Sequence, residues 1–140
     1  MSRLLAAIRT RVQLGDGAMG TQLQDAGLES GGCGEAWNLD HPARVLAIQR
    51  GYVEAGSDCL ITNTFGASRI MLARHGEAGR TAAINTAGVT VARAAFAGRA
   101  GFVFGDIGPF GGLMEPYGEI SRAEVHAAFR EQARALVAGR

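Results

Sequence analysis

The sequence predicts a mixed α/β fold with a parallel sheet, the front part of a longer βα-repeating protein. Three short apolar segments, 12–16, 58–63 and 102–106, are each followed by helix-forming sequence. These segments lie about 45 residues apart, a spacing that needs crossover connections and therefore parallel strands. Residues 135–140 resemble the helix end that precedes 58–63. We therefore expect a fourth strand to follow the last residue.

Length and composition indicate a single folded unit. The chain has 140 residues, of which 47% are hydrophobic and 19% charged, as in globular rather than disordered proteins. A formal net charge of +1 gives no excess that would favour a nucleic acid or a membrane surface as partner. The amino-terminal residues are too short and too interrupted by arginine for a signal peptide, and no apolar run reaches the length of a membrane span. We expect a cytoplasmic protein.

The first half of the chain predicts three helices and one strand. Residues 2–10 have the spacing of a short amphipathic helix, and a strand over 12–16 follows. A helix over 18–26 is expected to stop at Gly27, and the glycine-rich stretch 28–40 is expected to be irregular. Pro42 at a first helical turn opens the clearest helix, which Gly56 ends.

The second half repeats the pattern. Segment 58–63 is an unalternating apolar run, typical of a strand buried on both faces. Helices are expected over 67–74 and 80–96, and a third strand over 102–106. A loop over 108–120 then leads to Ser121–Glu124, which has the sequence of a capping box for the last helix. No linker or domain boundary interrupts 1–140.

The cysteines and histidines do not form a metal motif. Cys33 and Cys59 are 26 positions apart, with no CxxC pair and no histidine at ligand spacing. Cys59 opens an apolar run and is expected to be a buried small hydrophobic residue. His41 and His75 lie at helix boundaries and are interpreted as end residues rather than ligands. This chain alone is not expected to hold zinc.

Polar residues follow each predicted strand at equivalent places. Asp16 follows the first, Asn63 and Thr64 follow the second, and Asp106 follows the third. The carboxyl ends of parallel strands meet at one mouth, where βα proteins build their sites. Each cluster alone also fits ordinary turn and capping chemistry. Their recurrence in register favours a site.

The turn after the first strand has the composition of an amino acid site. Gly17 and Gly20 bracket Ala18 and Met19 and precede Thr21, which leaves main-chain N–H groups exposed at a helix start. Such groups bind carboxylates, and a neighbouring aspartate can accept a hydrogen bond from an ammonium. Neither GxGxxG nor GxxxxGK[ST] occurs, so a nucleotide is not indicated.

Five motifs in order resemble the homocysteine S-methyltransferase family, the homocysteine-binding domain of cobalamin-dependent methionine synthase and its relatives. They are Asp16-Gly-Ala-Met-Gly-Thr21, Trp37-Asn-Leu-Asp-His-Pro42, Tyr52-Val-Glu-Ala-Gly-Ser-Asp58, Ile61-Thr-Asn-Thr-Phe-Gly66 and Gly105-Asp-Ile-Gly-Pro109. Each motif is modest alone, and the five together are specific. The resemblance covers residues 12–138.

The resemblance implies a (β/α)₈ barrel, of which 1–140 would be the first three βα units and the N-terminal portion of one homocysteine-binding domain. It implies methyl transfer to a homocysteine thiolate that zinc holds and activates. Asp16 and the turn Gly17–Thr21 would bind the amino acid end of homocysteine. Asn63, Thr64 and Asp106 would be walls of the same pocket.

The rest of the machinery implied by the resemblance lies outside this chain. The three zinc cysteines belong to the second half of such a barrel, and neither Cys33 nor Cys59 takes their place. Catalytic and metal-binding residues are therefore not expected in 1–140, and the isolated chain should be inactive. Methylcobalamin is one of several methyl donors used by relatives, and cobalamin or folate domains are candidates for the sequence downstream.

Three other interpretations stay open. The first is a corrinoid-linked methyltransferase of the same superfamily, acting on another methylated substrate. The second is a non-catalytic half-barrel that pairs with another chain. The third, an unrelated flavodoxin-like domain, fits the periodicity but leaves the five ordered motifs unexplained.

Overall fold

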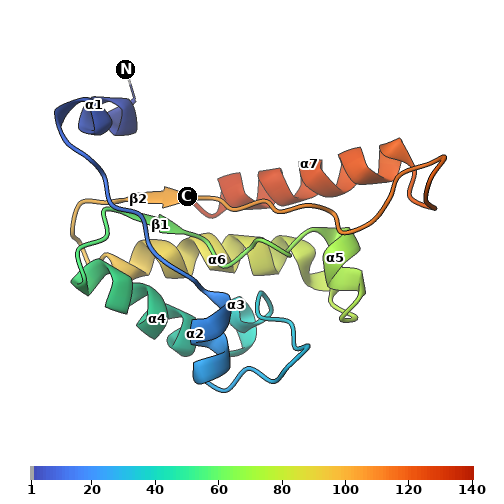
Figure 1. Ribbon diagram of the computed structural model, residues 1–140, viewed down its shortest axis with the longest axis horizontal. Helices are drawn as coiled ribbons and strands as arrows, with labels where there is room; N and C mark the ends of the chain where they lie inside the picture. Colours follow the sequence, from blue (N-terminus) through green and yellow to red (C-terminus); the bar gives the residue numbers. More distant parts are fainter. Residues whose placement is uncertain (1) are drawn as a thin grey trace.

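The computed structural model describes residues 2–140 as an α/β fold, in which helices pack around a small parallel sheet (Figure 1). The helices confirm most of the expected order. They are α1 (Arg3–Thr10), α2 (Gly20–Asp25), α3 (Trp37–Asp40), α4 (Pro42–Glu54), α5 (Arg69–Ala73), the 3₁₀ turn η1 (Ala78–Arg80), α6 (Thr81–Ala95) and α7 (Arg122–Ala138).

The sheet is parallel, as predicted, and shorter than predicted. Strand β1 (Cys59–Ile61) pairs in parallel with β2 (Phe102–Phe104). The prediction of a full strand over 12–16 is wrong: that segment makes one isolated parallel bridge, from Gly15 to Cys59. Hydrogen bonds still align it with β1, since Asp16 N–H donates to the carbonyl of Cys59 at 3.0 Å. β1 therefore lies between the 12–16 segment and β2.

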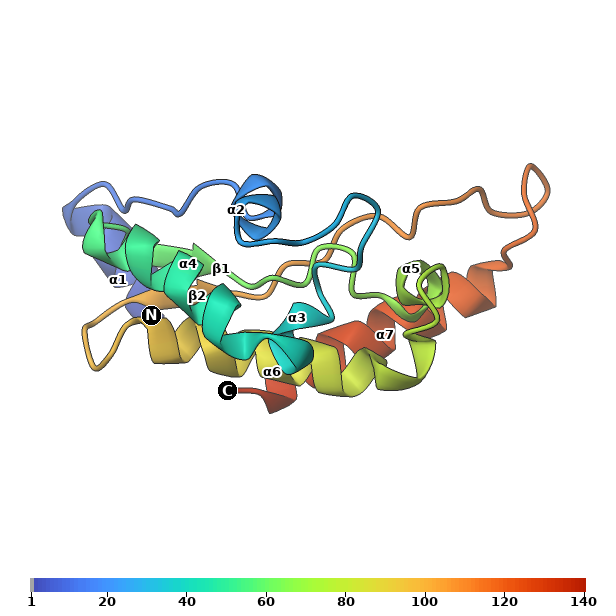
Figure 2. The same cartoon turned by 90° about the horizontal axis from the view of Figure 1, so that it is seen from below.

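Helices α4 and α6 pack against the two strands, and α7 packs along α6 (Figure 2). Leu60 is fully buried and packs with Val53 of α4 and with Ala95 and Phe96 at the end of α6. Burying a leucine side chain contributes about 1.5–3 kcal/mol, so this cluster anchors the helices to β1. Neighbouring Ile61 is 43% exposed, because successive side chains of a strand point to opposite faces.

Local sequence explains where the main helices begin and end. Pro42 is in the first turn of α4, and Gly56 follows the helix with φ +109°, a left-handed conformation that favours glycine. The capping box predicted for the last helix is present: Ser121 Oγ accepts from Glu124 N–H, and the Glu124 side chain accepts from Ser121 N–H. His41 occupies the N-cap position of α4 but makes no side-chain cap bond.

Two features of the first half differ from the prediction. Helix α2 begins at Gly20 rather than near residue 18, because residues 17–19 form the turn that follows Asp16. The stretch expected to be irregular contains the single-turn helix α3, whose Trp37 and Asn38 are buried. Trp37 packs against Leu23 and Val45, which joins α2, α3 and α4 in one core cluster.

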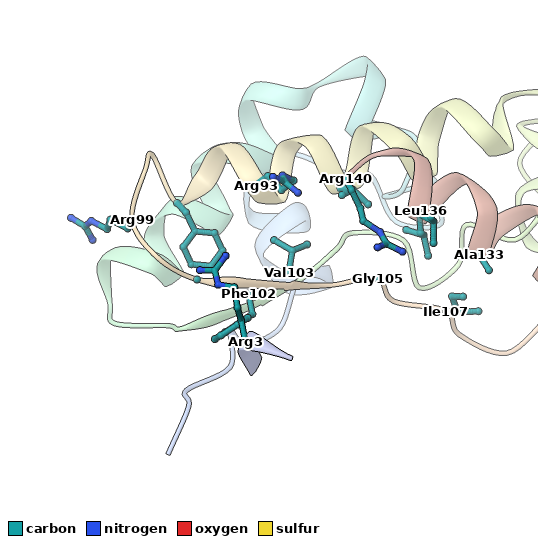
Figure 3. Close-up of a pocket in the computed structure, with 14 residues that line it drawn as sticks. Arg3, Arg93, Arg99, Phe102, Val103, Gly105, Ile107, Ala133, Leu136 and Arg140 are labelled. Atoms are coloured by element: carbon teal, nitrogen blue, oxygen red, sulfur yellow. The ribbon is translucent and has the colours of Figure 1, made fainter. Parts of the chain in front are cut away.

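An open pocket of about 580 Å³ runs along the free edge of β2 (Figure 3). Its floor is apolar and includes Phe102, Val103 and Leu136, and four arginines surround it (Arg3, Arg93, Arg99 and Arg140). None of these four forms an ion pair with a carboxylate within residues 2–140. Among residues 2–140, the helices lack the combination of length and hydrophobicity that a membrane span requires.

Candidate functional site

The carboxylate of Asp16, at the end of the 12–16 segment, is held by a hydrogen bond from β1. Its Oδ2 accepts a hydrogen bond from the Ile61 main-chain N–H at 2.9 Å. Its Oδ1 is buried and has no hydrogen-bond partner among the described residues. Burial raises the pKa of Asp16, and the Ile61 hydrogen bond opposes this shift. One carboxylate oxygen is thus anchored, and the other lacks a hydrogen-bond donor among the described residues.

Tyr52 of α4 holds the turn after Asp16 through a hydrogen bond and close packing. The Tyr52 hydroxyl donates to the Ala18 carbonyl at 2.7 Å. A Cβ on Gly17 would lie 2.9 Å from the Tyr52 ring, so the close packing of turn and ring requires glycine here. The first amide that donates into α2 is that of Leu23, to the Met19 carbonyl at 2.9 Å. The amides before it, including those of Gly20 and Thr21, begin the helix without an intrahelical acceptor.

Asp106 lies beyond the end of β2 and shares this end of the sheet with Asp16. Burial raises the pKa of Asp106, and the negative charges of Asp16 and then Glu35 raise it further. Asp106 is thus near enough to Asp16 for that carboxylate's charge to raise its pKa. Two carboxylates that repel each other at one mouth suit a cationic ligand group.

Asn63 and Thr64 lie at the same end but under its surface. Asn63 Nδ2 donates to the Gly34 carbonyl at 2.8 Å and to Asn38 Oδ1 at 3.2 Å. Thr64 is fully buried, and its Oγ1 donates to the Asp106 carbonyl at 2.8 Å. Their side chains therefore bind protein groups and hold the mouth in shape. Their role as walls of a ligand pocket stays a prediction.

Two residues at the mouth were not anticipated from the sequence. Glu35 Oε1 accepts from the Gly66 main-chain N–H at 2.8 Å, which ties the loop before α3 to the loop after β1. Asn38 Nδ2 donates to the Asn63 carbonyl at 2.8 Å. The signal for Asn38 was its place beside Trp37 in one of the five motifs. Glu35 carries no such signal, because its partner is 31 residues away.

The described residues do not fit a zinc site. No group of three or more His, Cys, Asp or Glu side chains in 2–140 is arranged to hold a metal ion. Cys59 is buried in β1, Cys33 lies in the loop before α3, and burial raises the pKa of both thiols. These residues therefore assign no step of a reaction to zinc.

Comparison with known proteins decides the family. The family model of homocysteine S-methyltransferase matches residues 13–140. The chain belongs to the homocysteine S-methyltransferase family. This confirms the resemblance of the five motifs.

Relatives of this homocysteine S-methyltransferase family member include two methionine synthases. The one from Mycobacterium tuberculosis is 36% identical over 97% of this chain and 12% of its own length. The one from Mycobacterium leprae is 35% identical over the same shares. The chain therefore spans about an eighth of the length of these curated relatives, and each matches it almost from end to end.

Solved structures confirm the α/β fold. The metallated form of the homocysteine methyltransferase MmuM from Escherichia coli superposes with a TM-score of 0.78 at 24% identity, over 99% of this chain and 54% of that one. The oxidized form gives a TM-score of 0.79 over the same shares. The homocysteine S-methyltransferase family member described here thus has the fold of about half of that enzyme.

Proposed function

We propose that residues 13–140 form the amino acid-binding part of a homocysteine S-methyltransferase, an enzyme that transfers a methyl group to the homocysteine thiolate and yields methionine. The observation that carries this proposal is the placement of Asp16. One oxygen of this carboxylate is anchored by Ile61, and the other is buried without a partner among the described residues, at the mouth of the sheet. A ligand ammonium supplies the donor that this oxygen lacks.

The two ends of an amino acid fit the groups at this mouth. Asp16 and Asp106 would face the ammonium of homocysteine, since their mutual repulsion is relieved by one positive charge. The amides at the start of α2, from Gly20 onward, would donate to its carboxylate. Asn63 and Thr64 would support this pocket from beneath.

The groups that act on the sulfur would come from outside residues 13–140. Zinc, once bound, would lower the pKa of the homocysteine thiol, and no described group of residues can hold it. The methyl donor, cobalamin included, is likewise not specified by this chain. We propose that the pocket at the free edge of β2 (Figure 3) accepts the continuation of the barrel, because its floor is apolar and β2 has an unpaired side.

A titration of ¹⁵N-labelled chain with L-homocysteine tests the amino acid site directly. We expect amide shifts confined to residues 16–21 and to the neighbourhoods of Ile61 and Asp106. Homoserine, which keeps the amino acid end and replaces the thiol, should give the same pattern, because this chain recognises that end. Shifts spread over the outer helices, or none at saturating ligand, would contradict the proposal.

A further inference from the structure

The hydrogen-bond ladder between β1 and β2 continues past the strands through side chains. The last rung of main-chain bonds joins Thr62 N–H to the Phe104 carbonyl at 2.9 Å. Beyond it, the Asp106 N–H donates to Thr62 Oγ1 at 2.9 Å, and Thr64 Oγ1 donates to the Asp106 carbonyl at 2.8 Å. The two threonine hydroxyls are 2.6 Å apart. Both polar groups of the Asp106 main chain are thus held by buried hydroxyls.

Gln132 of α7 closes this network from the helix layer. It is fully buried, and its Nε2 donates to the Thr64 carbonyl at 2.8 Å and contacts the Asp106 carbonyl at 3.5 Å. One side-chain amide therefore touches the ends of both strands. Its own Oε1 is buried without a partner among the described residues.

The buried amide of Gln132 carries an energetic cost. An unpartnered buried carbonyl oxygen is destabilising, and an apolar side chain of the same size would avoid it. Gln49 and Asn85 repeat the device at other carbonyls: they donate to Ile61 and Ala67, and each leaves its oxygen without a partner in the described part of the chain. Of these three side-chain amides, only that of Gln132 contacts the main chain of Asp106, whose carboxylate belongs to the proposed amino acid site.

We propose that Gln132 is a positioning residue, which acts through Thr64 and the Asp106 main chain to hold Asp106 in place at the amino acid site. This inference rests on the proposed function. Gln132 touches no ligand; it sets the distance between two carboxylates that would share one ammonium. The same amide locks α7 to the sheet end, so a shift of α7 would move Asp106.

The test replaces Gln132 by methionine, which is similar in size and cannot donate. Two quantities are followed by NMR in the chain 1–140: the titration midpoint of the Asp106 carboxyl and the exchange rate of its amide proton. We expect the pKa of Asp106 to fall toward its ordinary value, because it moves away from Asp16 and Glu35. Amide exchange should rise ~3- to ~10-fold, the effect of about one lost hydrogen bond.

The matched control is Asn85→Leu, which removes a buried amide of the same kind that bonds Ala67 and not Asp106. It should leave both Asp106 readouts unchanged. Equal effects of the two variants, or an unchanged titration in Gln132→Met, would overturn the assignment. If Gln132→Met does not fold, Gln132→Asn, which is one methylene too short to reach both carbonyls, is subject to the same criteria.

Neither readout involves homocysteine, so the two proposals fail separately. A chain that shows the Gln132 effect and binds no homocysteine keeps the positioning role and loses the proposed function. A chain that binds homocysteine but shows no Gln132 effect keeps the proposed function and loses the positioning role.

Discussion

The main-chain amide of Ile61 donates to Asp16 Oδ2 at 2.9 Å, across a gap of 45 residues in sequence. This bond ties the Asp16 carboxylate, at the end of the 12–16 segment, to strand β1. The second oxygen, Oδ1, is left buried and without a partner among residues 2–140. A carboxylate held in this way is costly to the free chain and ready for a cation, which is the expected balance at a binding site.

Asp16→Asn should therefore separate stability from binding. The asparagine Oδ1 can still accept from Ile61 N–H, and the loss of charge relieves the repulsion of Asp106. We expect an unchanged or higher Tm in thermal unfolding. Homocysteine binding should weaken by ~10- to ~100-fold, because a hydrogen bond to a charged group contributes about 1.5–3 kcal/mol. Asp25→Asn, an exposed change at the end of α2, is the control.

The ion pair of Arg11 with Asp58 predicts a loss of stability in acid. Arg11 donates to both carboxylate oxygens at 2.8 and 2.6 Å, and Leu14 N–H adds a third bond at 3.0 Å. The pKa of Asp58 falls from 3.8 to about 2, mainly because of the hydrogen bond from Arg11 and secondarily because of the one from Leu14 N–H. A lowered pKa means that this stabilisation is present above about pH 4 and is lost as the pH falls toward about 2.

Denaturant unfolding of wild type and Asp58→Asn over this pH range checks the prediction. The gap between the two free energies of unfolding should close as the pH falls from about 4 to about 2. A gap that stays constant throughout would assign the Asp58 contribution to its shape rather than its charge.

Gly88 of α6 is closely packed against residues next to the candidate site, so a larger side chain there should disturb the packing. A Cβ at this position would lie 2.7 Å from Thr64 Cγ2 and 2.9 Å from Asn38 Nδ2. Gly88→Ala should lower the free energy of unfolding by about 1–3 kcal/mol through overpacking, although alanine favours helix. Gly51→Ala in α4, where nothing lies within 4 Å, is the matched control and should be neutral or stabilising. Equal effects of both would exclude close packing as the cause.

Thr64→Val tests the side-chain hydrogen bonds that join the chain after β1 to the chain after β2. Valine keeps the shape and removes the hydroxyl that bonds the Asp106 carbonyl and the Thr62 hydroxyl. We expect a loss of about 1–3 kcal/mol in denaturant unfolding, because buried polar partners remain unsatisfied. Thr90→Val, at an exposed threonine of α6 whose hydroxyl bonds its own helix, should cost less. A comparable loss in both variants would mean that the buried rung adds nothing.

Patterns of short range explain what could be predicted from sequence. The parallel sheet, the helix opened by Pro42 and the capping box of Ser121 and Glu124 follow from periodicity and capping chemistry within a few residues. The apolar residues of the 12–16 segment predict a strand, but only Gly15 makes a bridge. Strand pairing depends on neighbours far away in sequence, which local propensity does not report.

The candidate site shows the same division. The place of Asp16 and Asp106 after strands predicts that they share one end of the sheet, and the charge of Asp16 raises the pKa of Asp106. The buried amide of Gln132 was not predicted, because its partners are up to 68 residues away and it lies among ordinary helix residues. Glu35 was missed for the same reason.

A chimera puts the amino acid site to its most direct test. Residues 1–140 replace the segment that they match in the Mycobacterium tuberculosis methionine synthase, and methionine formed from homocysteine is assayed beside chimeras that carry Asp16→Asn or Asp25→Asn. We predict methionine formation by the first chimera and by Asp25→Asn, and a loss of at least about tenfold in Asp16→Asn, as expected for a charged hydrogen bond. A chimera that unfolds as cooperatively as the parent enzyme, yet forms no more methionine than Asp16→Asn, would contradict the proposed role of Asp16.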